Sequence, residues 1–228
     1  MTPEQLTGND PSYLTSILIG SKSFLVDPKA GQDLRHLMLT AEKAGFRFHI
    51  ASGFRSFNDQ LSIWNRKVSG ELTVRDSNNC VVDISGLTES TIVRAILNWS
   101  ALPGTSRHHW GTDFDVYDAD ALPEDAQILL EPWEYKSGHQ ADFSQWLTEN
   151  VEKHGFFFPY DKNRGGVAYE PWHISHLETS KHCLSQLSLD VLHQQLNKTE
   201  ILARESIFSL LDEIYNQYIT NINPIGRT

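Results

Sequence analysis

Apolar and polar residues follow two different periods along the first half of the chain. Apolar side chains recur at helical spacing over residues 33–44 and 92–99, which predicts a helix over each range. Residues 46–51 and 112–117 instead alternate apolar with polar side chains, which is typical of half-buried strands. Helices and short strands in mixed order favour an α+β fold with a small, mostly antiparallel sheet flanked by helices.

The second half of the chain is richer in predicted helix. The apolar spacing predicts one helix over residues 143–154. A last strand candidate covers residues 167–176, with a break at Pro171, because proline cannot donate to a sheet ladder. Two further helices are predicted over residues 184–196 and 201–218.

These patterns predict one domain over residues 1–183, followed by a helical C-terminal extension over residues 184–228. The simplest expectation is that the apolar faces of the extension pack on the same domain. A dimer contact is the alternative, and the sequence leaves the oligomeric state open. Nothing in the extension carries obvious chemistry.

A turn over residues 52–57 follows the first predicted strand and precedes another helix, for which Asn58 is the expected cap. Arg55 stands in this turn. Functional groups are often found at such junctions, because a rigid element holds them in place. Residues 67–90 are polar and predict a loop or a short ribbon.

Composition and charge narrow the class of protein. The chain has 228 residues, of which 39% are hydrophobic and 21% charged, values typical of a globular domain. Its formal charge of -10 at pH 7 disfavours nucleic-acid partners. No apolar run approaches the ~18 residues of a membrane span. The N-terminus lacks the basic start and apolar core of a secretory signal, so we expect a cytoplasmic protein, with the periplasm or cell envelope as alternatives.

Two short segments concentrate the residues that a catalytic metal site requires. Residues 106–115, SRHHWGTDFD, contain two histidines and two carboxylates, and residues 170–173, EPWH, add a glutamate and a histidine. A catalytic zinc site has three protein ligands, an open position for water and a nearby base. His108 and Asp115 are an odd number of residues apart, so the chain must turn at Gly111 if both are to face one cavity.

Three segments together resemble the LAS zinc metallopeptidases, the group that includes lysostaphin and the hedgehog proteins. SRHHWGTDFD matches their SxHxxGxxxD pattern, and EPWH matches their ExWH element. SGFRSFNDQ, residues 52–60, resembles the SGYRS element of the VanY-type D-alanyl-D-alanine carboxypeptidases. The segments occur in the family's order, and the combination is far more specific than any one of them.

The resemblance implies one zinc ion per chain and two catalytic groups beside it. The implied ligands are His108, Asp115 and His173, with Glu170 as the base and Arg55 as the group that stabilises the reacting carbonyl. In the implied reaction, Glu170 takes a proton from the attacking water and passes it to the leaving amine. Residues 1–183 would then be a zinc metallopeptidase domain with the family's small zinc-bearing sheet.

Other residues near these motifs have more open roles. By the same resemblance, Ser106 and Gln60 match positions near the substrate. Trp172 either lines the substrate cleft or packs in the core. The family usually has a small residue where this chain has Asp113, which is either a partner of a histidine ligand or a solvated carboxylate.

Two further histidines and a tryptophan lie in or near these motifs, and each could belong either to the site or to the packing around it. His109 competes with His108 as a ligand, but the register with Gly111 favours His108 and leaves His109 as a supporting or solvent-facing group. His176 and Trp110 are interpreted as packing residues, because strand alternation points His176 away from the site and large aromatics are mostly core.

The predicted activity is zinc-dependent removal of the terminal D-alanine from peptidoglycan stem peptides or muropeptides. An L,D-carboxypeptidase, a D,D-dipeptidase and a peptidoglycan endopeptidase are alternatives that share every motif. A non-catalytic, zinc-stabilised binding module is the alternative from another class. The presence of Glu170 and Arg55 argues against it, since a structural zinc site needs neither.

Overall fold

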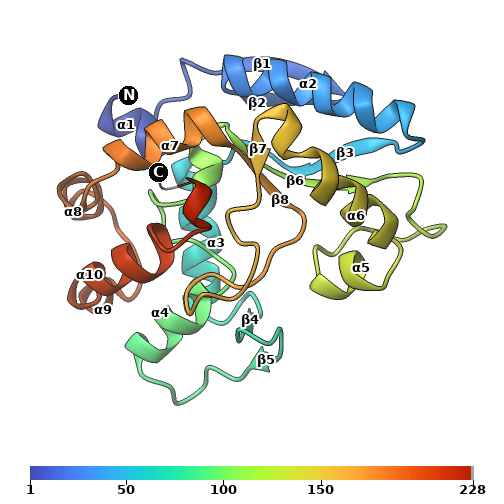
Figure 1. The fold of residues 1–228 in the computed structure, drawn as a ribbon. Helices are drawn as coiled ribbons and strands as arrows, with labels where there is room; N and C mark the ends of the chain where they lie inside the picture. The colour runs from blue at the N-terminus through green and yellow to red at the C-terminus, as the bar shows by residue number, and fades with distance from the viewer. Residues whose placement is uncertain (227–228) are drawn as a thin grey trace.

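A four-stranded antiparallel sheet lies at the centre of the computed structural model, which describes residues 1–226 (Figure 1). In spatial order its strands are β3 (Phe48–Ser52), β6 (Asp113–Asp118), β8 (His173–His176) and β7 (Phe156–Phe157). Every neighbouring pair is antiparallel. The predicted α+β fold with a small, mostly antiparallel sheet is confirmed.

Two smaller sheets and the helices surround this central sheet. The smaller sheets pair β1 (Thr15–Ile19) with β2 (Lys22–Val26), and β4 (Val74–Arg75) with β5 (Val81–Val82). The α-helices are α1 (Pro3–Leu6), α2 (Pro28–Lys43), α3 (Phe57–Val68), α4 (Glu89–Leu97), α5 (Pro132–Lys136), α6 (Ala141–Asn150), α7 (Leu177–Gln186), α8 (Leu189–Asn197), α9 (Arg204–Ser209) and α10 (Leu211–Ile214). The remaining helical turns are η1 (Arg107–Trp110), η2 (Glu152–His154), the π-helix η3 (Tyr215–Ile219) and η4 (Pro224–Gly226). No helix formed by residues 1–226 is both long and apolar enough to cross a membrane.

The two faces of the central sheet differ in polarity. Side chains alternate between faces along a strand, so Phe114 and Val116 of β6 share one face with Ile174 of β8. That face packs against α2 and α6 in one hydrophobic cluster. The opposite face therefore carries Asp113 and Asp115 of β6 and His173 of β8.

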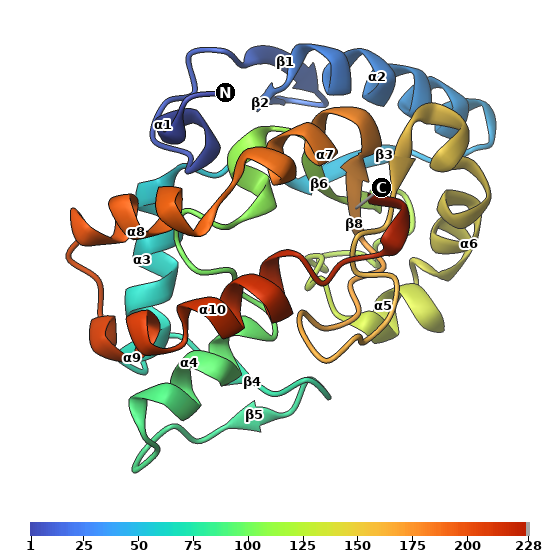
Figure 2. The ribbon, with the colours of Figure 1, turned by 60° about the vertical axis from the view of Figure 1, so that its left-hand side comes forward.

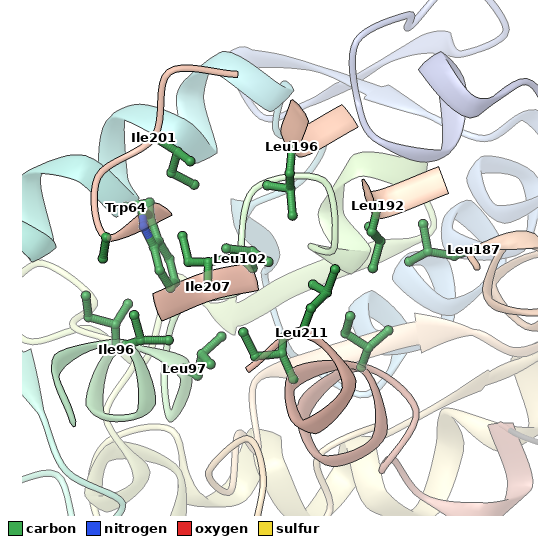
Figure 3. Close-up of a cluster of buried hydrophobic side chains, with 14 of the residues drawn as sticks. Trp64, Ile96, Leu97, Leu102, Leu187, Leu192, Leu196, Ile201, Ile207 and Leu211 are labelled. Carbon is green, nitrogen blue, oxygen red and sulfur yellow. The ribbon is translucent and has the colours of Figure 1, made fainter. Parts of the chain in front are cut away.

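A second hydrophobic cluster joins the C-terminal helices to α3 and α4. Figure 3 shows Trp64 of α3 and Ile96 of α4 facing Leu196 of α8, Ile207 of α9 and Leu211 of α10, and all five side chains are buried. The apolar periodicity of the extension is thus used for packing on α3 and α4.

The helices of the extension are shorter than predicted. The helix expected over residues 184–196 is divided at Leu187, and Ser188 caps α8 by accepting a hydrogen bond from the Val191 amide. The helix expected over residues 201–218 begins only after Ala203, whose φ of 59° lies in the left-handed region.

Three other expectations need correction. Ser56, and not Asn58, caps α3, since its side chain accepts from the Asp59 amide. The strand expected over residues 167–176 shrinks to β8, because the chain turns immediately before it, with the His173 amide donating to the Glu170 carbonyl at 3.2 Å. β1 was not predicted at all.

We propose that residues 1–183 and the extension form one folding unit, and substitutions in α10 test this proposal. Leu211→Ala removes a side chain that is 2% exposed, so we expect it to lower the free energy of unfolding by about 2–5 kcal/mol. Glu213→Gln, in the same helix, breaks a largely solvated ion pair with Arg94 and should cost about 1 kcal/mol or less. Urea unfolding of both variants gives the comparison, and equal costs would contradict the proposal.

Candidate metal-dependent active site

Three potential metal ligands converge on the polar face of the central sheet. Asp115 of β6 is the direct partner of His173 of β8 in the antiparallel register, so their side chains leave the sheet together. His108 comes from η1, just before β6. One ligand atom from each of the three lies within 4.8 Å of the others.

Gly111 makes this convergence possible. Its φ of 66° turns the chain from η1 into β6, a left-handed conformation that glycine adopts without strain. A Cβ at this position would lie 2.7 Å from Leu14 Cδ2 and 3.0 Å from the Asp27 amide nitrogen. The predicted turn at Gly111 is confirmed, and it resolves the odd spacing between His108 and Asp115.

The geometry of the three side chains fits a metal ion. His108 Nε2 lies 3.4 Å from Asp115 Oδ2, and His173 Nδ1 lies 3.3 Å from Asp115 Oδ1. His108 Nδ1 and Asp115 Oδ1 are buried without a hydrogen-bond partner among the described residues. Buried polar atoms are normally satisfied, so the unsatisfied carboxylate oxygen of Asp115 fits an additional ligand. Two imidazoles and one carboxylate form a donor set that suits zinc.

The two histidines differ in charge. Burial lowers the pKa of His108 to about 4, so its imidazole is neutral at pH 7. Burial also disfavours charge on His173, but the carboxylates of Asp113, Asp115 and Glu170 outweigh it and hold the pKa of His173 well above its ordinary value. A metal ion and a proton therefore compete for the same carboxylate-lined position.

Asp113 holds His173 from the side opposite to the ligand position. His173 Nε2 donates to Asp113 Oδ1 at 3.0 Å, which leaves Nδ1 directed at Asp115. Arg107 Nε donates to the same Asp113 oxygen at 2.7 Å, and the Thr112 hydroxyl donates to the other at 2.6 Å. Asp113 is fully buried, so the solvated alternative is wrong and the histidine-partner alternative is confirmed.

Arg107 balances the charge of Asp113 in the interior. Burial opposes ionisation of Asp113, but the adjacent guanidinium and His173 hold the pKa of this carboxyl well below its ordinary value. The guanidinium also donates to the Ser175 hydroxyl at 2.6 Å and lies over the Trp110 ring. Sequence reasoning missed Arg107, because nothing in the pattern marks an arginine beside a ligand as buried.

Glu170 lies beside this group, on the turn that precedes β8. Its Oε2 is 3.3 Å from His173 Nδ1, and the residue is 8% exposed. Burial raises the pKa of the Glu170 carboxyl above its ordinary value. A raised pKa brings a carboxylate closer to the range in which it can both take and return a proton near neutral pH.

Arg55 is fixed on the other side of the site through its backbone and its side chain. The Arg55 amide donates to the His108 carbonyl at 3.1 Å, and His109 Nδ1 donates to the Arg55 carbonyl at 2.7 Å. The guanidinium donates to Ser52 Oγ at 2.8 Å and to Gln60 Oε1 at 2.9 Å. The loop that carries His108 thus also sets the position of Arg55.

Two predicted residues support Arg55 from behind. Gln60 is fully buried, and its amide also donates to the Ala101 carbonyl at 2.7 Å, so the structure places Gln60 behind Arg55 and not at the cleft surface. His109 is fully buried as well, and its Nε2 accepts from the Gly104 amide at 3.1 Å. Both His109 nitrogens are therefore engaged, which rules out the solvent-facing alternative.

A cleft of about 500 Å³ opens over the site. Its lining includes the predicted residues Ser106 and Trp172, together with His108, Asp115, His173, Glu170 and Arg55. Sequence reasoning missed Trp99, which stacks on Trp172 at a centroid distance of 6.3 Å, and Tyr160, whose ring lies 5.1 Å from that of His173. Aromatic stacking between distant segments leaves no local sequence signal.

The packing interpretations of Trp110 and His176 are confirmed. Trp110 is fully buried, and its indole nitrogen donates to the Leu6 carbonyl at 3.0 Å. His176 is 1% exposed and hydrogen-bonds Asp33 and Thr179, away from the metal-ligand group.

The structure thus places a buried His-Asp-His group beside a glutamate and an arginine on a small antiparallel sheet, which is the arrangement implied by the sequence resemblance to the LAS metallopeptidases. The chain belongs to the VanY D-alanyl-D-alanine carboxypeptidase family, whose model matches residues 23–179.

Relatives by sequence include an uncharacterized protein and a D-alanyl-D-alanine carboxypeptidase. An uncharacterized protein of Haemophilus influenzae is 37% identical over 121 residues, which cover 52% of this chain and 92% of that protein. A D-alanyl-D-alanine carboxypeptidase of Enterococcus faecalis is 26% identical over 183 residues, which cover 79% of this chain and 56% of that protein.

Solved structures share the fold. VanYB in complex with D-alanine-D-alanine superposes with a TM-score of 0.52 at 24% identity, covering 82% of this chain and 89% of that chain. A mutant of the D,D-pentapeptidase VanY in complex with Zn(II) has a TM-score of 0.51 at 21% identity, covering 87% and 92%. The LD-carboxypeptidase LdcB has a TM-score of 0.53 at 20% identity, covering 92% and 80%.

The contact between Asp113 and His173 generates a prediction about metal affinity. Asp113→Asn leaves a neutral amide beside the imidazole and a buried, unbalanced Arg107, so we expect zinc affinity to fall about 10–100-fold. Competition with a chromogenic zinc chelator measures it. Asp118→Asn, at the far end of the same strand, is the matched control and should keep wild-type affinity. Equal affinities of the two variants would contradict a role of Asp113 in holding the ligand.

Proposed function

We propose that this chain is a zinc-dependent carboxypeptidase that removes the terminal D-alanine from peptidoglycan stem peptides ending in D-alanyl-D-alanine. One observation carries the proposal. Three ligand atoms meet within 4.8 Å, in the same cleft as a buried glutamate and a fixed arginine. Family membership supports the peptide substrate, and the VanYB complex with D-alanine-D-alanine supports the choice of terminal residue.

One zinc ion per chain would be held by His108, Asp115 and His173. When bound, zinc supplies Lewis acidity and makes a water nucleophilic near neutral pH. The neutral state of the buried His108 imidazole suits this role. Asp113 keeps the His173 ring in the orientation that presents Nδ1.

Glu170 is the proposed general base. Its carboxylate lies beside the ligand group and inside the cleft, so it can accept the proton of the attacking water. It then returns that proton to the leaving amine of D-alanine. Its raised pKa favours the first of these transfers, because the carboxylate of a weaker acid is a stronger base towards the attacking water.

Arg55 is the proposed stabiliser of the oxyanion that forms on the scissile carbonyl. Its guanidinium is held by Ser52 and Gln60, so little reorganisation is needed when charge develops. Donors of this kind are worth roughly 3–4 kcal/mol in other hydrolases. Gln60 contributes through Arg55, whereas Ser106 and Trp172 are proposed to contact the substrate directly.

Activity against a defined peptide tests the substrate. Zinc-loaded protein should release D-alanine from a pentapeptide ending in D-alanyl-D-alanine, and a chelator should abolish release until zinc is restored. Elemental analysis should give one zinc per chain. Release only from a tetrapeptide would replace the proposal with an L,D-carboxypeptidase, and cleavage only of the free dipeptide or of cross-linked peptidoglycan would replace it with a dipeptidase or an endopeptidase.

Substitution of the base separates an enzyme from a binding module. Glu170→Gln should lower turnover about 10²–10⁴-fold, because the proton acceptor is lost, while zinc stoichiometry is retained. D-alanine release and metal content are measured on the same preparation. Glu178→Gln, at an exposed position of α7, is the control and should keep full activity. Undiminished turnover in Glu170→Gln would overturn its assignment as base.

A further inference from the structure

The loop between β7 and β8 includes residues 158–170, three of which line the cleft: Tyr160, Val167 and Glu170. Tyr160 stands at its beginning and Glu170 at its end. The Glu170 amide donates to the Tyr160 carbonyl at 3.1 Å, so the two residues close the neck of the loop. The position of Glu170 therefore depends on how this loop is held.

The end of the C-terminal extension holds the neck of the loop. Asn223 donates from its backbone amide to the Pro159 carbonyl at 2.9 Å and from its side chain to the Phe158 carbonyl at 3.2 Å. These two carbonyls directly precede Tyr160. In Figure 2 the red C-terminal stretch runs from α10 towards β8, beside the orange loop that precedes this strand.

The same segment also holds the far end of the loop. The Asn221 side chain donates to the Arg164 carbonyl at 2.9 Å, and the Gln217 side chain donates to the Gly165 carbonyl. Gly166 is in direct contact with the Gln217 carbonyl, and a Cβ at this glycine would overlap it. The loop and the segment are therefore packed at backbone distance.

These contacts differ in kind from the rest of the extension. The helices of the extension pack apolar side chains against α3 and α4. Gln217, Asn221 and Asn223 instead direct their side-chain amides at backbone carbonyls of the loop, where the chain forms no strand. Backbone carbonyls of an irregular loop have no partners in a helix or sheet, so they need hydrogen-bond donors from other parts of the chain. Such hydrogen bonds restrict the motion of the loop.

We propose that residues 217–223 are a positioning element for the loop of the catalytic base, so that the extension serves catalysis as well as packing. This inference rests on the proposed role of Glu170. A base must stay within hydrogen-bond reach of the proton that it takes, and small displacements are costly in rate. The segment acts through the loop, whose backbone carbonyls its amide side chains contact.

The test uses the full-length, zinc-loaded protein with Asn221→Ala and Asn223→Ala combined. Both substitutions remove a side-chain donor and leave the backbone contact to Pro159 in place. Asn216→Ala is the matched control, since its side chain donates to the Asp212 carbonyl of α10 at 2.8 Å and, within residues 1–226, to no carbonyl of the loop. Hydrogen exchange of residues 158–170, kcat, KM and zinc affinity are measured on each.

We expect amide exchange in the loop to quicken about tenfold and kcat to fall about tenfold, with smaller changes in KM and unchanged zinc affinity. Asn216→Ala should match the wild-type protein in loop exchange, kcat, KM and zinc affinity. Unchanged loop exchange would overturn the inference, and so would a parallel loss of zinc affinity, because the effect would then run through the metal ligands.

Two further comparisons distinguish a failure of this inference from a folding defect and from a failure of the proposed function. If the double variant does not fold, Gln217→Ala, at a half-buried residue, replaces it and should quicken exchange at the tip of the loop. If the wild-type protein releases no D-alanine, the proposed function fails, while the exchange data still decide whether residues 217–223 hold the loop.

Discussion

The pairing of β6 with β8 is the constraint on which the site depends. It places Asp115 opposite His173 on one face and Phe114 opposite Ile174 on the other. Because side chains alternate with a period of two, a slip of one residue would put the carboxylates into the apolar core and the aromatic ring into the cleft. The burial of Phe114 and Ile174 therefore stabilises the same register that aligns the ligands.

Charge balance in the interior follows from this register. Asp113 and Asp115 both leave β6 on the polar face, where neither reaches water freely. Arg107 pairs with Asp113, so that one carboxylate is neutralised by protein and held as the support of His173. Asp115 is paired with no arginine and has a buried oxygen without a hydrogen-bond partner among the described residues, which is costly unless a metal cation joins it. The arrangement thus divides two neighbouring carboxylates between a supporting and a metal-facing position.

Much of this site could be predicted from the sequence, because motif residues and strand alternation are local signals. The strands that carry Asp115 and His173 and the turn at Gly111 followed from spacing and residue type, whereas the partnership of Asp113 with a histidine was one of two alternatives that the sequence left open. Gln60 could not be placed behind Arg55, since a side chain's direction depends on what packs against it. Tyr160 was missed for a related reason: it lies in an irregular loop where no period applies.

The extension shows the same division between local and long-range information. Apolar periodicity predicted that residues 184–228 would pack on the domain, although it could not show where Leu187 and Ala203 would break the helices. The apolar pattern carried no information on Asn221 and Asn223, because asparagine is common in any surface turn that follows a helix. What distinguishes these two is that loop carbonyls far away in the sequence lie within reach of their amides. A segment that lines no part of the cleft can thereby be tied to Glu170, the proposed base.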